Sequence, residues 1–316
     1  MNEKDLKILE QYDLQMEKIY RGRGSYLCEA VGNIYLFREY HVSEEKACAI
    51  AQIVDAVSDG TDILADKFIR NKEGNYISRD RDKIGFVLKK WCRARECDTK
   101  NIDEILTVVH HMAKLHKKSD EIGQVELNQN PKICREEFEK RIKEMKKVRN
   151  YIVKKKSKTE FELLYLKSFD KYMLVAVKAL EDVSKLKERP LELCHGDFTQ
   201  HNALIGENGI YIVNFEKCHY GSQMEDLYLF MRKILEKHEW NIEIGKKMLN
   251  AYIQEKPLDN NQKQELYLRF LFPEKFWKIS NHYYNSRKVW GIERNKGKLN
   301  KLNEQMDIKQ KFVYGL

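Results

Sequence analysis

The residues best suited to chemistry lie in a short stretch near position 195, which reads LCHGDFTQHN over residues 193–202. Asp197 follows His195 and Gly196, and Asn202 comes five residues after Asp197. In phosphoryl transfer a loop carboxylate accepts or orients the proton of the attacking hydroxyl, and an amide oxygen on the same loop can bind Mg²⁺. The spacing therefore predicts Asp197 as a catalytic base and Asn202 as a metal ligand.

A hairpin is expected directly after this loop. Two short apolar strands, at 203–205 and 210–213, are joined by residues 206–209, which read GENG. An Asn-Gly pair between two such strands is a strong signal for a tight turn. The second strand ends in the sequence NFE at 214–216. The hairpin would return this segment to the loop, where a carboxylate normally chelates the metal that bridges the phosphates.

Asp226 stands twelve residues beyond position 214, at the start of an expected helix. It lies too far along the chain to serve as a metal ligand. A carboxylate at a helix start can instead accept hydrogen bonds from backbone N–H groups and so fix a loop. We therefore expect Asp226 to give structural support.

The overall composition favours a folded chain. The 316 residues are 42% hydrophobic and 34% charged, with 15 glycines and 4 prolines, which excludes disordered and fibrous classes. No apolar run approaches the roughly 18–20 residues of a membrane span, and the opening MNEKDLKILE lacks the apolar stretch of a signal peptide. We expect a chain made in the cytoplasm without a signal peptide and without a membrane span.

The net charge of +9 comes from 58 lysine and arginine residues against 49 aspartate and glutamate residues. Basic residues cluster at 143–158 and at 294–311, and both runs are interleaved with acidic or apolar residues at helical spacing. Solvated helix faces usually have this pattern. No recognisable nucleic-acid module is present, so we expect no nucleic acid among the partners.

The hydrophobic patterning predicts a mixed first part and a helical second part. Up to position 91, a short helix at 3–12 and a helix capped by Ser43 alternate with strands at 18–20, 26–30, 33–40, 66–71 and 84–91, and with a strand that follows a turn at 72–75 and ends at 79. Beyond 101, a helix that begins after the capping residue Asn101 is expected at 102–116, and further helices are expected at 136–156 and 159–186. A β-like stretch at 191–212 and then helices to the end follow. The predicted division is a small β-rich lobe at 1–92 and a mainly helical lobe at 93–316, with a hinge at about 91–100.

The motif His195-Gly196-Asp197 followed by Asn202 resembles the catalytic loop of the aminoglycoside phosphotransferase and choline kinase superfamily, H-G-D-x-x-x-x-N. The resemblance implies a bilobal α+β fold of the protein-kinase-like type. It places His195 and Asp197 in the catalytic loop. It also implies ATP and Mg²⁺ as cofactors.

Further runs that carry a narrower resemblance extend over most of the chain and lie at 21–30, 91–98, 112–116, 214–218, 226–237 and 271–286. They resemble the CotS-type spore-coat proteins of endospore-forming bacteria. This narrower resemblance implies association with the spore coat and other coat proteins as partners, and it implies no known reaction.

The strand at 34–40 matches the one that carries a phosphate-binding lysine in kinase-like folds, and here it offers Arg38. Arginine keeps the charge but is longer, planar and fork-shaped, so the exchange is not neutral. The next helix should direct a glutamate toward that lysine, yet no acidic residue lies between Glu45 and Asp55. The turn containing Gly22 and Gly24 could approach phosphates through backbone N–H groups, and a plain hairpin turn explains it equally well.

Position 214 departs most from the superfamily pattern, because Asn214 stands where the metal-chelating aspartate is expected. An amide in place of a carboxylate removes one negative charge from a site for a hard cation. Glu216 lies two residues on, points the same way along an extended chain, and could take over. The predicted metal ligands are therefore Asn202, Asn214 and Glu216.

Two hypotheses of different class follow. In the first, which we favour, the chain is a degraded or weakly active kinase that acts by binding in the spore coat, with weak or absent binding of ATP and Mg²⁺. In the second, it is an active ATP-dependent phosphotransferase acting on a small molecule or a coat component. The second would use Asp197 as base, Asn202 and Glu216 on Mg²⁺, and Arg38 on phosphate.

Overall fold

The computed structural model describes residues 3–22, 24–127, 129–285 and 291–315. The chain divides into two compact units, each described by itself below. Unit 1 comprises Met1–Asn130, Leu193–His219 and Gln254–Lys256, and unit 2 comprises Pro131–Glu192, Tyr220–Ile253 and Pro257–Leu316. Unit 1 thus continues past the predicted boundary at residues 92 and 93. The predicted boundary separates two lobes, whereas the two units are defined by contacts between residues. The lobe boundary therefore stays a prediction.

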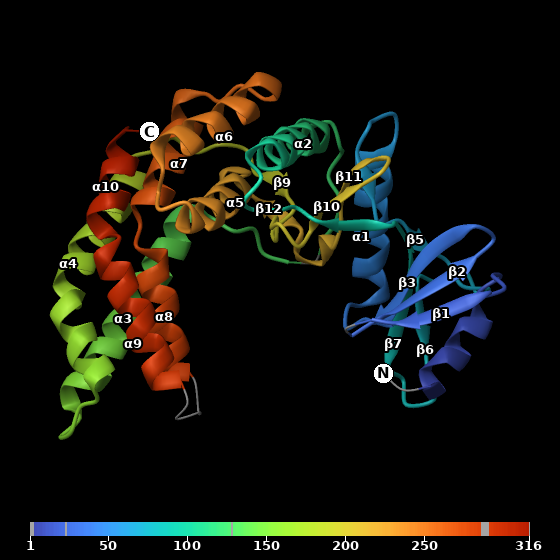
Figure 1. The fold of residues 1–316 in the computed structure, drawn as a ribbon, viewed down its shortest axis with the longest axis horizontal. Helices are drawn as coiled ribbons and strands as arrows, with labels where there is room; N and C mark the ends of the chain where they lie inside the picture. The colour runs from blue at the N-terminus through green and yellow to red at the C-terminus, as the bar shows by residue number, and fades with distance from the viewer. Residues whose placement is uncertain (1–2, 23, 128, 286–290, 316) are drawn as a thin grey trace. The chain divides into compact units, whose positions relative to one another are not determined.

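Unit 1 contains a six-stranded sheet in which β3 and β7 are the central pair (Figure 1). The strand order is β1-β2-β3-β7-β5, and β6 also pairs with β7. The strands are β1 (Lys18–Arg21), β2 (Tyr26–Ala30), β3 (Asn33–Glu39), β5 (Phe68–Ile69), β6 (Ile77–Arg79) and β7 (Gly85–Trp91).

Side chains alternate between the two faces of this sheet, because successive residues of a strand point to opposite sides. On one face Phe37 and Leu88 pack against Ile8 and Leu9 of the 3₁₀ helix η1 (Glu3–Gln11). On the other face, Val87 packs in a cluster with residues of helix α1 (Glu44–Ser58). The sheet is therefore covered on both sides, which explains the continuous burial of residues 85–89 in β7.

Two predicted helix starts in unit 1 are confirmed. The hydroxyl of Ser43 accepts a hydrogen bond from the backbone N–H of Lys46 at 3.3 Å and caps α1. The side chain of Asn101 accepts from two backbone N–H groups at the start of α2 (Ile102–Asp120). Both caps satisfy N–H groups that have no partner within the helix.

A second sheet in unit 1 joins three distant parts of the chain. Its strand order is β4-β11-β10-β8. The predicted hairpin is confirmed as β10 (Ala203–Gly206) and β11 (Gly209–Ile212), with β4 (Leu64–Ala65) parallel to β11 and β8 (Ala94–Glu96) antiparallel to β10. Of the expected strand at 66–71 only Phe68–Ile69 (β5) forms, and Asp66 lies buried between β4 and β5 rather than within a strand.

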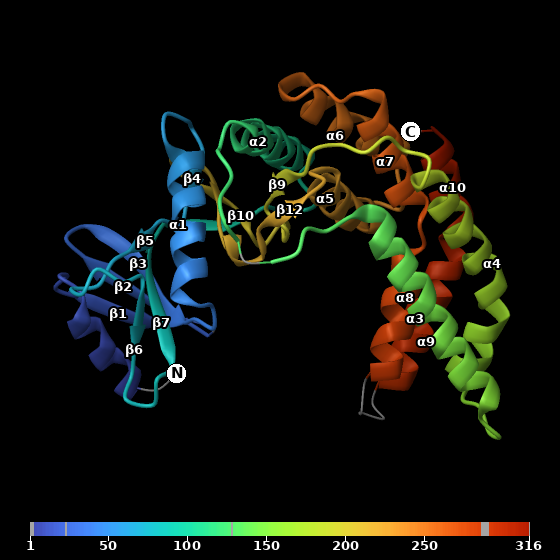
Figure 2. The same cartoon turned by 180° about the vertical axis from the view of Figure 1, so that it is seen from behind.

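Unit 2 is helical, and α3, α4, α8 and α9 lie side by side (Figures 1 and 2). Their shared core includes stacked rings, with Phe138 4.0 Å from Phe272 and Tyr165 4.9 Å from Phe276 between ring centroids. The helices are α3 (Cys134–Lys154), α4 (Glu160–Val183), α5 (Met224–Lys237), α6 (Ile242–Glu255), α7 (Asn260–Leu271), α8 (Glu274–Asn285), α9 (Gly291–Glu304) and α10 (Met306–Gly315). The remaining strands, β9 (Glu192–Cys194) and β12 (His219–Gly221), form a two-stranded sheet. The expected α+β class is confirmed.

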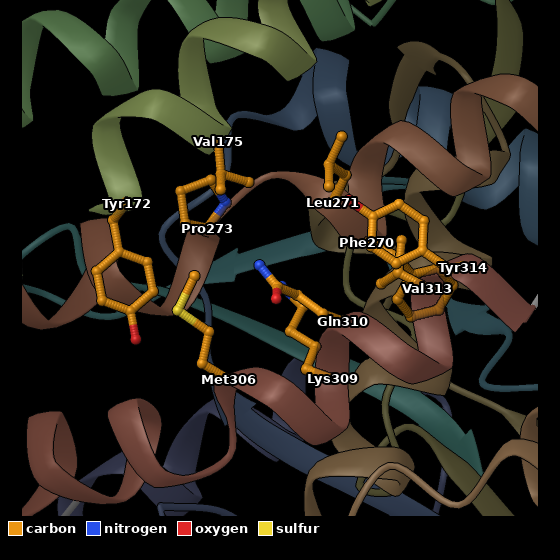
Figure 3. Close-up of a pocket in the computed structure, with 10 residues that line it drawn as sticks. All are labelled: Tyr172, Val175, Phe270, Leu271, Pro273, Met306, Lys309, Gln310, Val313 and Tyr314. Carbon is orange, nitrogen blue, oxygen red and sulfur yellow. The ribbon is translucent and has the colours of Figure 1, made fainter. Parts of the chain in front are cut away.

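Lys309 of α10 lines a small, mainly apolar cavity of about 30 Å³ in unit 2 (Figure 3). Its ammonium lies 3.5 Å from the carbonyl oxygen of Phe272. Burial, followed by the positive charge of Arg232, lowers the pKa of Lys309 to about 8, and the nearby carboxylates of Glu236 and Glu274 only partly compensate. The charged form of this lysine is therefore disfavoured in the folded chain.

We expect Lys309→Met to raise the free energy of unfolding by about 1–3 kcal/mol at pH 7, because methionine fills the space without a desolvated charge. The folded pKa of about 8 lies below the ordinary 10.5, so the penalty is fully present below pH 8. It should disappear as the pH rises from 8 to 10.5. Urea unfolding at several pH values measures this, with Lys311→Met at an exposed position of the same helix as control. A destabilised Lys309→Met protein at pH 7 would contradict the prediction.

Candidate functional site

His195 holds the predicted catalytic loop against the end of the β10–β11 hairpin. Its ring is buried, with Nε2 3.1 Å from the carbonyl oxygen of Val213 and Nδ1 3.2 Å from the backbone nitrogen of Asp197. The ring centroid also lies 4.7 Å from that of Phe215. Both ring nitrogens are thus engaged with the backbone, which favours a positioning role for His195 within the loop.

Gly196 permits this close approach. Its φ is +78°, in the left-handed region, and a Cβ placed there would lie 2.1 Å from the carbonyl oxygen of Lys217. Any side chain at this position would force the loop and the segment after β11 apart. The loop geometry therefore depends on glycine between His195 and Asp197.

The side chains of Asn202 and Asn214 are brought together, as the sequence predicts. Asn202 donates through Nδ2 to the carbonyl oxygen of Asp197 at 2.8 Å, and Asn214 donates through Nδ2 to Oδ1 of Asn202, also at 2.8 Å. Asn214 has φ 68° and ψ 60°, a left-handed conformation that asparagine tolerates better than most residues. The oxygen that Asn202 would offer to Mg²⁺ consequently accepts an amide hydrogen.

The candidate base Asp197 stays partly exposed. Its carboxylate is 2.9 Å from the ammonium of Lys217, and the side chains are 37% and 65% exposed. An exposed ion pair of this kind is weak and breaks easily. The Asp197 carboxylate is therefore open to other partners.

A buried cluster of charged side chains lies beside Asn202 and Asn214, which we call the amide pair. The ammonium of Lys89 is 2.8 Å from Oδ2 of Asp66 and 2.9 Å from Oε1 of Glu216. Arg38 donates to the same Oε1 of Glu216. The side chains of Lys89 and Asp66 are fully buried, and that of Glu216 is 19% exposed. We call Arg38, Asp66, Lys89 and Glu216 the charge cluster.

Strand pairing positions the two cations of the charge cluster. In the β3–β7 ladder Arg38 is opposite Val87, and Leu36 is opposite Lys89. Residues opposite one another in an antiparallel pair share a face, and residues two apart along a strand share it too. Arg38 and Lys89 are therefore diagonal neighbours on the sheet face that packs in a cluster with α1.

Asp66 connects the charge cluster to the amide pair. Each of its carboxylate oxygens lies 3.3 Å from the backbone nitrogen of Asn214, while Oδ2 also binds Lys89. The position of Asn214 is thus fixed by a residue 148 positions earlier in the chain.

The electrostatics of the charge cluster favour the ionised form of Glu216. Burial by itself would raise the pKa of this carboxyl, but Lys89 and then Arg38 outweigh burial and lower the pKa to about 2. The resulting stabilisation is fully present above the ordinary value of 4.5 and is lost as the pH falls toward 2. Glu216 is therefore an anion whose charge is already balanced by two cations of the protein.

The remaining predicted site residues lie in defined elements. Gly22 and Gly24 form the turn between β1 and β2, where Gly24 has φ +72°, and their predicted role in holding phosphate stays a prediction. Asp226 is fully buried in the first turn of α5 in unit 2, at the helix start that the sequence predicts. Its supporting role also stays a prediction.

The sequence reasoning missed Lys89 and Asp66. One signal was available, because Lys89 follows the apolar run GFVL at 85–88 and shares a strand face with Val87. A lysine in such a central strand needs a buried partner. The sequence gives no indication that this partner is Asp66, 23 residues earlier, together with Glu216.

The donor set does not suit a tightly held Mg²⁺. Two of the three predicted ligands are neutral amides that bind each other, and the third, Glu216, is paired with Lys89 and Arg38. Over the described residues no group of three or more His, Cys, Asp or Glu side chains could hold a metal ion. Mg²⁺ requires near-octahedral oxygen ligands, usually including carboxylates. No step is therefore assigned to a metal here.

The fold is similar to that of solved phosphotransferases and kinases. An aminoglycoside phosphotransferase from Alicyclobacillus acidocaldarius is 14% identical, with a TM-score of 0.82 over 98% of this chain and 94% of that chain. The AMP-bound spectinomycin phosphotransferase is 14% identical, with a TM-score of 0.65 over 98% and 92%. A choline kinase from Streptococcus pneumoniae is 12% identical, with a TM-score of 0.55 over 95% and 97%. These similarities confirm the kinase-like fold.

Residues 5–316 match the family described as "Spore coat putative kinase YutH". The chain belongs to this spore-coat kinase-like family. The predicted family resemblance is thereby confirmed over nearly the whole chain. In addition, no helix within the described ranges is long and apolar enough to cross a membrane.

We expect Lys89→Met to lower the free energy of unfolding by about 3–5 kcal/mol, because it leaves Asp66 buried and ionised without its cation. Adding Asp66→Asn should recover part of this loss, so the double variant should be less unstable than the sum of the two single variants. Denaturant unfolding of all four proteins measures the coupling.

The matched control for this cycle is Lys90→Met, which changes the exposed neighbour on the same strand. It should shift stability by less than about 1 kcal/mol. Equal effects of Lys89→Met and Lys90→Met, or simple additivity in the double variant, would contradict the importance of the buried pair.

Proposed function

We propose that this protein acts in the spore coat by binding, through a kinase fold whose nucleotide and metal site is degraded. Membership of a spore-coat kinase-like family supports the location and the ancestry of the fold. The observation that carries the proposal is the hydrogen bond from Nδ2 of Asn214 to Oδ1 of Asn202. This hydrogen bond joins the side chains at the two positions with which a kinase of this fold would hold its metal.

The charge balance supports weak or absent binding of ATP and Mg²⁺. Efficient phosphoryl transfer uses cationic side chains on the phosphates and anionic side chains on the metal. Here Glu216 accepts hydrogen bonds from both Lys89 and Arg38, and Lys89 also pairs with Asp66, so the two cations and two anions of the charge cluster neutralise each other. A metal bound at Glu216 would have to displace these contacts. Rescue of the Asn214 position by Glu216 is therefore costly.

The alternative is an active ATP-dependent phosphotransferase on a small molecule or coat component. One observation favours it, since the Asp197 carboxylate remains half exposed on a loop held by His195 and Gly196. The similar spectinomycin phosphotransferase was solved with AMP. We place this second, because the loop keeps a base but the paired amides give it no anionic metal ligand.

The proposed location and partners follow from the family. A coat protein that binds rather than catalyses would contact other spore-coat proteins, and we propose these as its partners. We propose no nucleic acid and no membrane as a partner. Nucleotide, if bound, would act as a weak ligand and not as a substrate.

We expect the unmodified protein to show little or no thermal stabilisation by Mg²⁺ and ATP, and Asn214→Asp to gain a shift of several degrees. The substitution adds a negatively charged oxygen at position 214 and removes the N–H group that is hydrogen-bonded to Oδ1 of Asn202. Adding Asn202→Ala to Asn214→Asp should abolish the gain. Differential scanning fluorimetry with and without Mg²⁺ measures each shift.

Asn208→Asp serves as the control, because it adds the same charge in the exposed hairpin turn of the same sheet. It should leave the response to Mg²⁺ and ATP unchanged. The proposal fails if the unmodified protein is stabilised by several degrees in an Asn202-dependent way. ATP turnover that Asp197→Asn removes would equally contradict it.

A further inference from the structure

The net charge is distributed very unevenly between the two units. Unit 1 contains 23 lysine and arginine residues against 27 acidic residues, a net charge of −4. Unit 2 contains 35 against 22, a net charge of +13. The basic character of the chain therefore belongs to unit 2 alone.

Within unit 2 the charge is concentrated at the end of α3 and its connection to α4. Residues 140–158 contain ten basic side chains and one acidic side chain, a net charge of +9 that equals the net charge of the whole chain. This excess is larger than a solvated helix face needs, because such faces usually mix both signs.

The arginines and the acidic residue of this segment are engaged within unit 2. The guanidinium of Arg141 lies 4.8 Å from the ring centroid of Trp277, and that of Arg149 lies 5.2 Å from the ring centroid of Phe169. The carboxylate of Glu144 accepts a hydrogen bond from the indole N–H of Trp277 at 2.6 Å. The charges that remain available to a partner are lysines.

Four of these lysines form one line along α3. Lys140, Lys143, Lys147 and Lys154 are all exposed, and their spacing of three, four and seven residues places them on one side of the helix. At about 1.5 Å per residue the line is about 21 Å long. Within the described ranges none of the four forms an ion pair with a carboxylate. We call these residues the lysine stripe.

An exposed aromatic pair interrupts the lysine stripe. Tyr151 lies between Lys147 and Lys154 at the same helical spacing and is 49% exposed. Its ring meets that of Tyr284 from α8 edge to face, with centroids 5.4 Å apart, and Tyr284 is 48% exposed. Exposed aromatic side chains such as tyrosine are enriched at protein interaction sites.

The lysine stripe is also unfavourable for the isolated chain. Lys143 and Lys147 are four residues apart, and Lys140 and Lys143 are three apart, so like charges face each other along the helix. A partner of opposite charge would remove this repulsion. The sequence thus retains an arrangement that stability alone does not favour.

We propose that the lysine stripe and the Tyr151–Tyr284 pair form a docking surface for an acidic amphipathic helix of another coat protein. This inference rests on the proposed function in the coat. Carboxylates of such a helix would pair with the lysines, and its apolar side chains would cover the two rings. A nucleic-acid backbone presents no apolar surface that could cover the two rings. The rings also contact each other edge to face, whereas stacking on bases requires ring faces that are free.

Fluorescence anisotropy of the full-length protein tests this with a synthetic acidic peptide of roughly 20 residues that carries leucines at helical spacing. Poly-glutamate of equal length, a DNA duplex and vesicles of phosphatidylglycerol with phosphatidylcholine are the comparison probes. We expect the leucine-containing peptide to bind several-fold more tightly than poly-glutamate. Lys143→Glu with Lys147→Glu should weaken its binding by roughly tenfold or more.

The matched control is Lys246→Glu with Lys247→Glu, which makes the same charge change at exposed positions of α6. It should alter peptide binding by no more than about twofold. The stripe variant should unfold at the same temperature as the unmodified protein or higher, because it relieves repulsion. Tyr151→Ser should weaken binding of the leucine-containing peptide and leave that of poly-glutamate unchanged.

Equal losses in the stripe and control variants, or tighter binding of DNA or vesicles than of the peptide, would overturn the inference. So would an unchanged affinity in Tyr151→Ser. These assays contain no nucleotide, and the Asn214→Asp assay does not involve the lysine stripe. ATP turnover would therefore contradict the proposed degraded kinase site but not the docking surface. Absence of peptide binding would contradict the docking surface but not the degraded kinase site.

Discussion

The buried contact between Lys89 and Asp66 is the constraint on which the rest of the candidate site depends. A charge without water needs a partner of opposite sign, so neither side chain can be buried in this sheet alone. Asp66 also accepts a hydrogen bond from the backbone N–H of Asn214, and Lys89 also donates a hydrogen bond to Glu216. One ion pair thereby fixes the segment after the hairpin against the six-stranded sheet.

The same constraint determines the partners of the polar side chains in the candidate site. The sequence resemblance predicts that cations, an anion and two amides lie at positions where a kinase would use them on a nucleotide and its metal. In this protein Arg38 and Lys89 both bind Glu216, and Asn214 binds Asn202. These side chains thus bind one another, although Oδ1 of Asn214 and Nε of Arg38 are buried without a hydrogen-bond partner among the described residues.

The two units differ in charge. Unit 1 keeps the catalytic loop and the charge cluster and carries a slightly negative charge, whereas unit 2 concentrates positive charge along one helix. Lysine side chains keep their flexibility and their hydration at a surface, which suits contacts that form by charge and are completed by a few apolar groups.

The sequence by itself determined the features that short-range geometry controls: the caps at Ser43 and Asn101, the hairpin around residues 206–209, and the meeting of Asn202 with Asn214. Each depends on residues within about a dozen positions of one another, where turn chemistry and hydrogen bonding act directly. Only the tertiary structure decided that Lys89 is buried and that Asp66 interrupts the expected strand at 66–71. Their pairing, and that of Arg38 with Glu216, joins residues 23 to 178 positions apart. Such charges pair only because packing removes them from water, and no local pattern reports that.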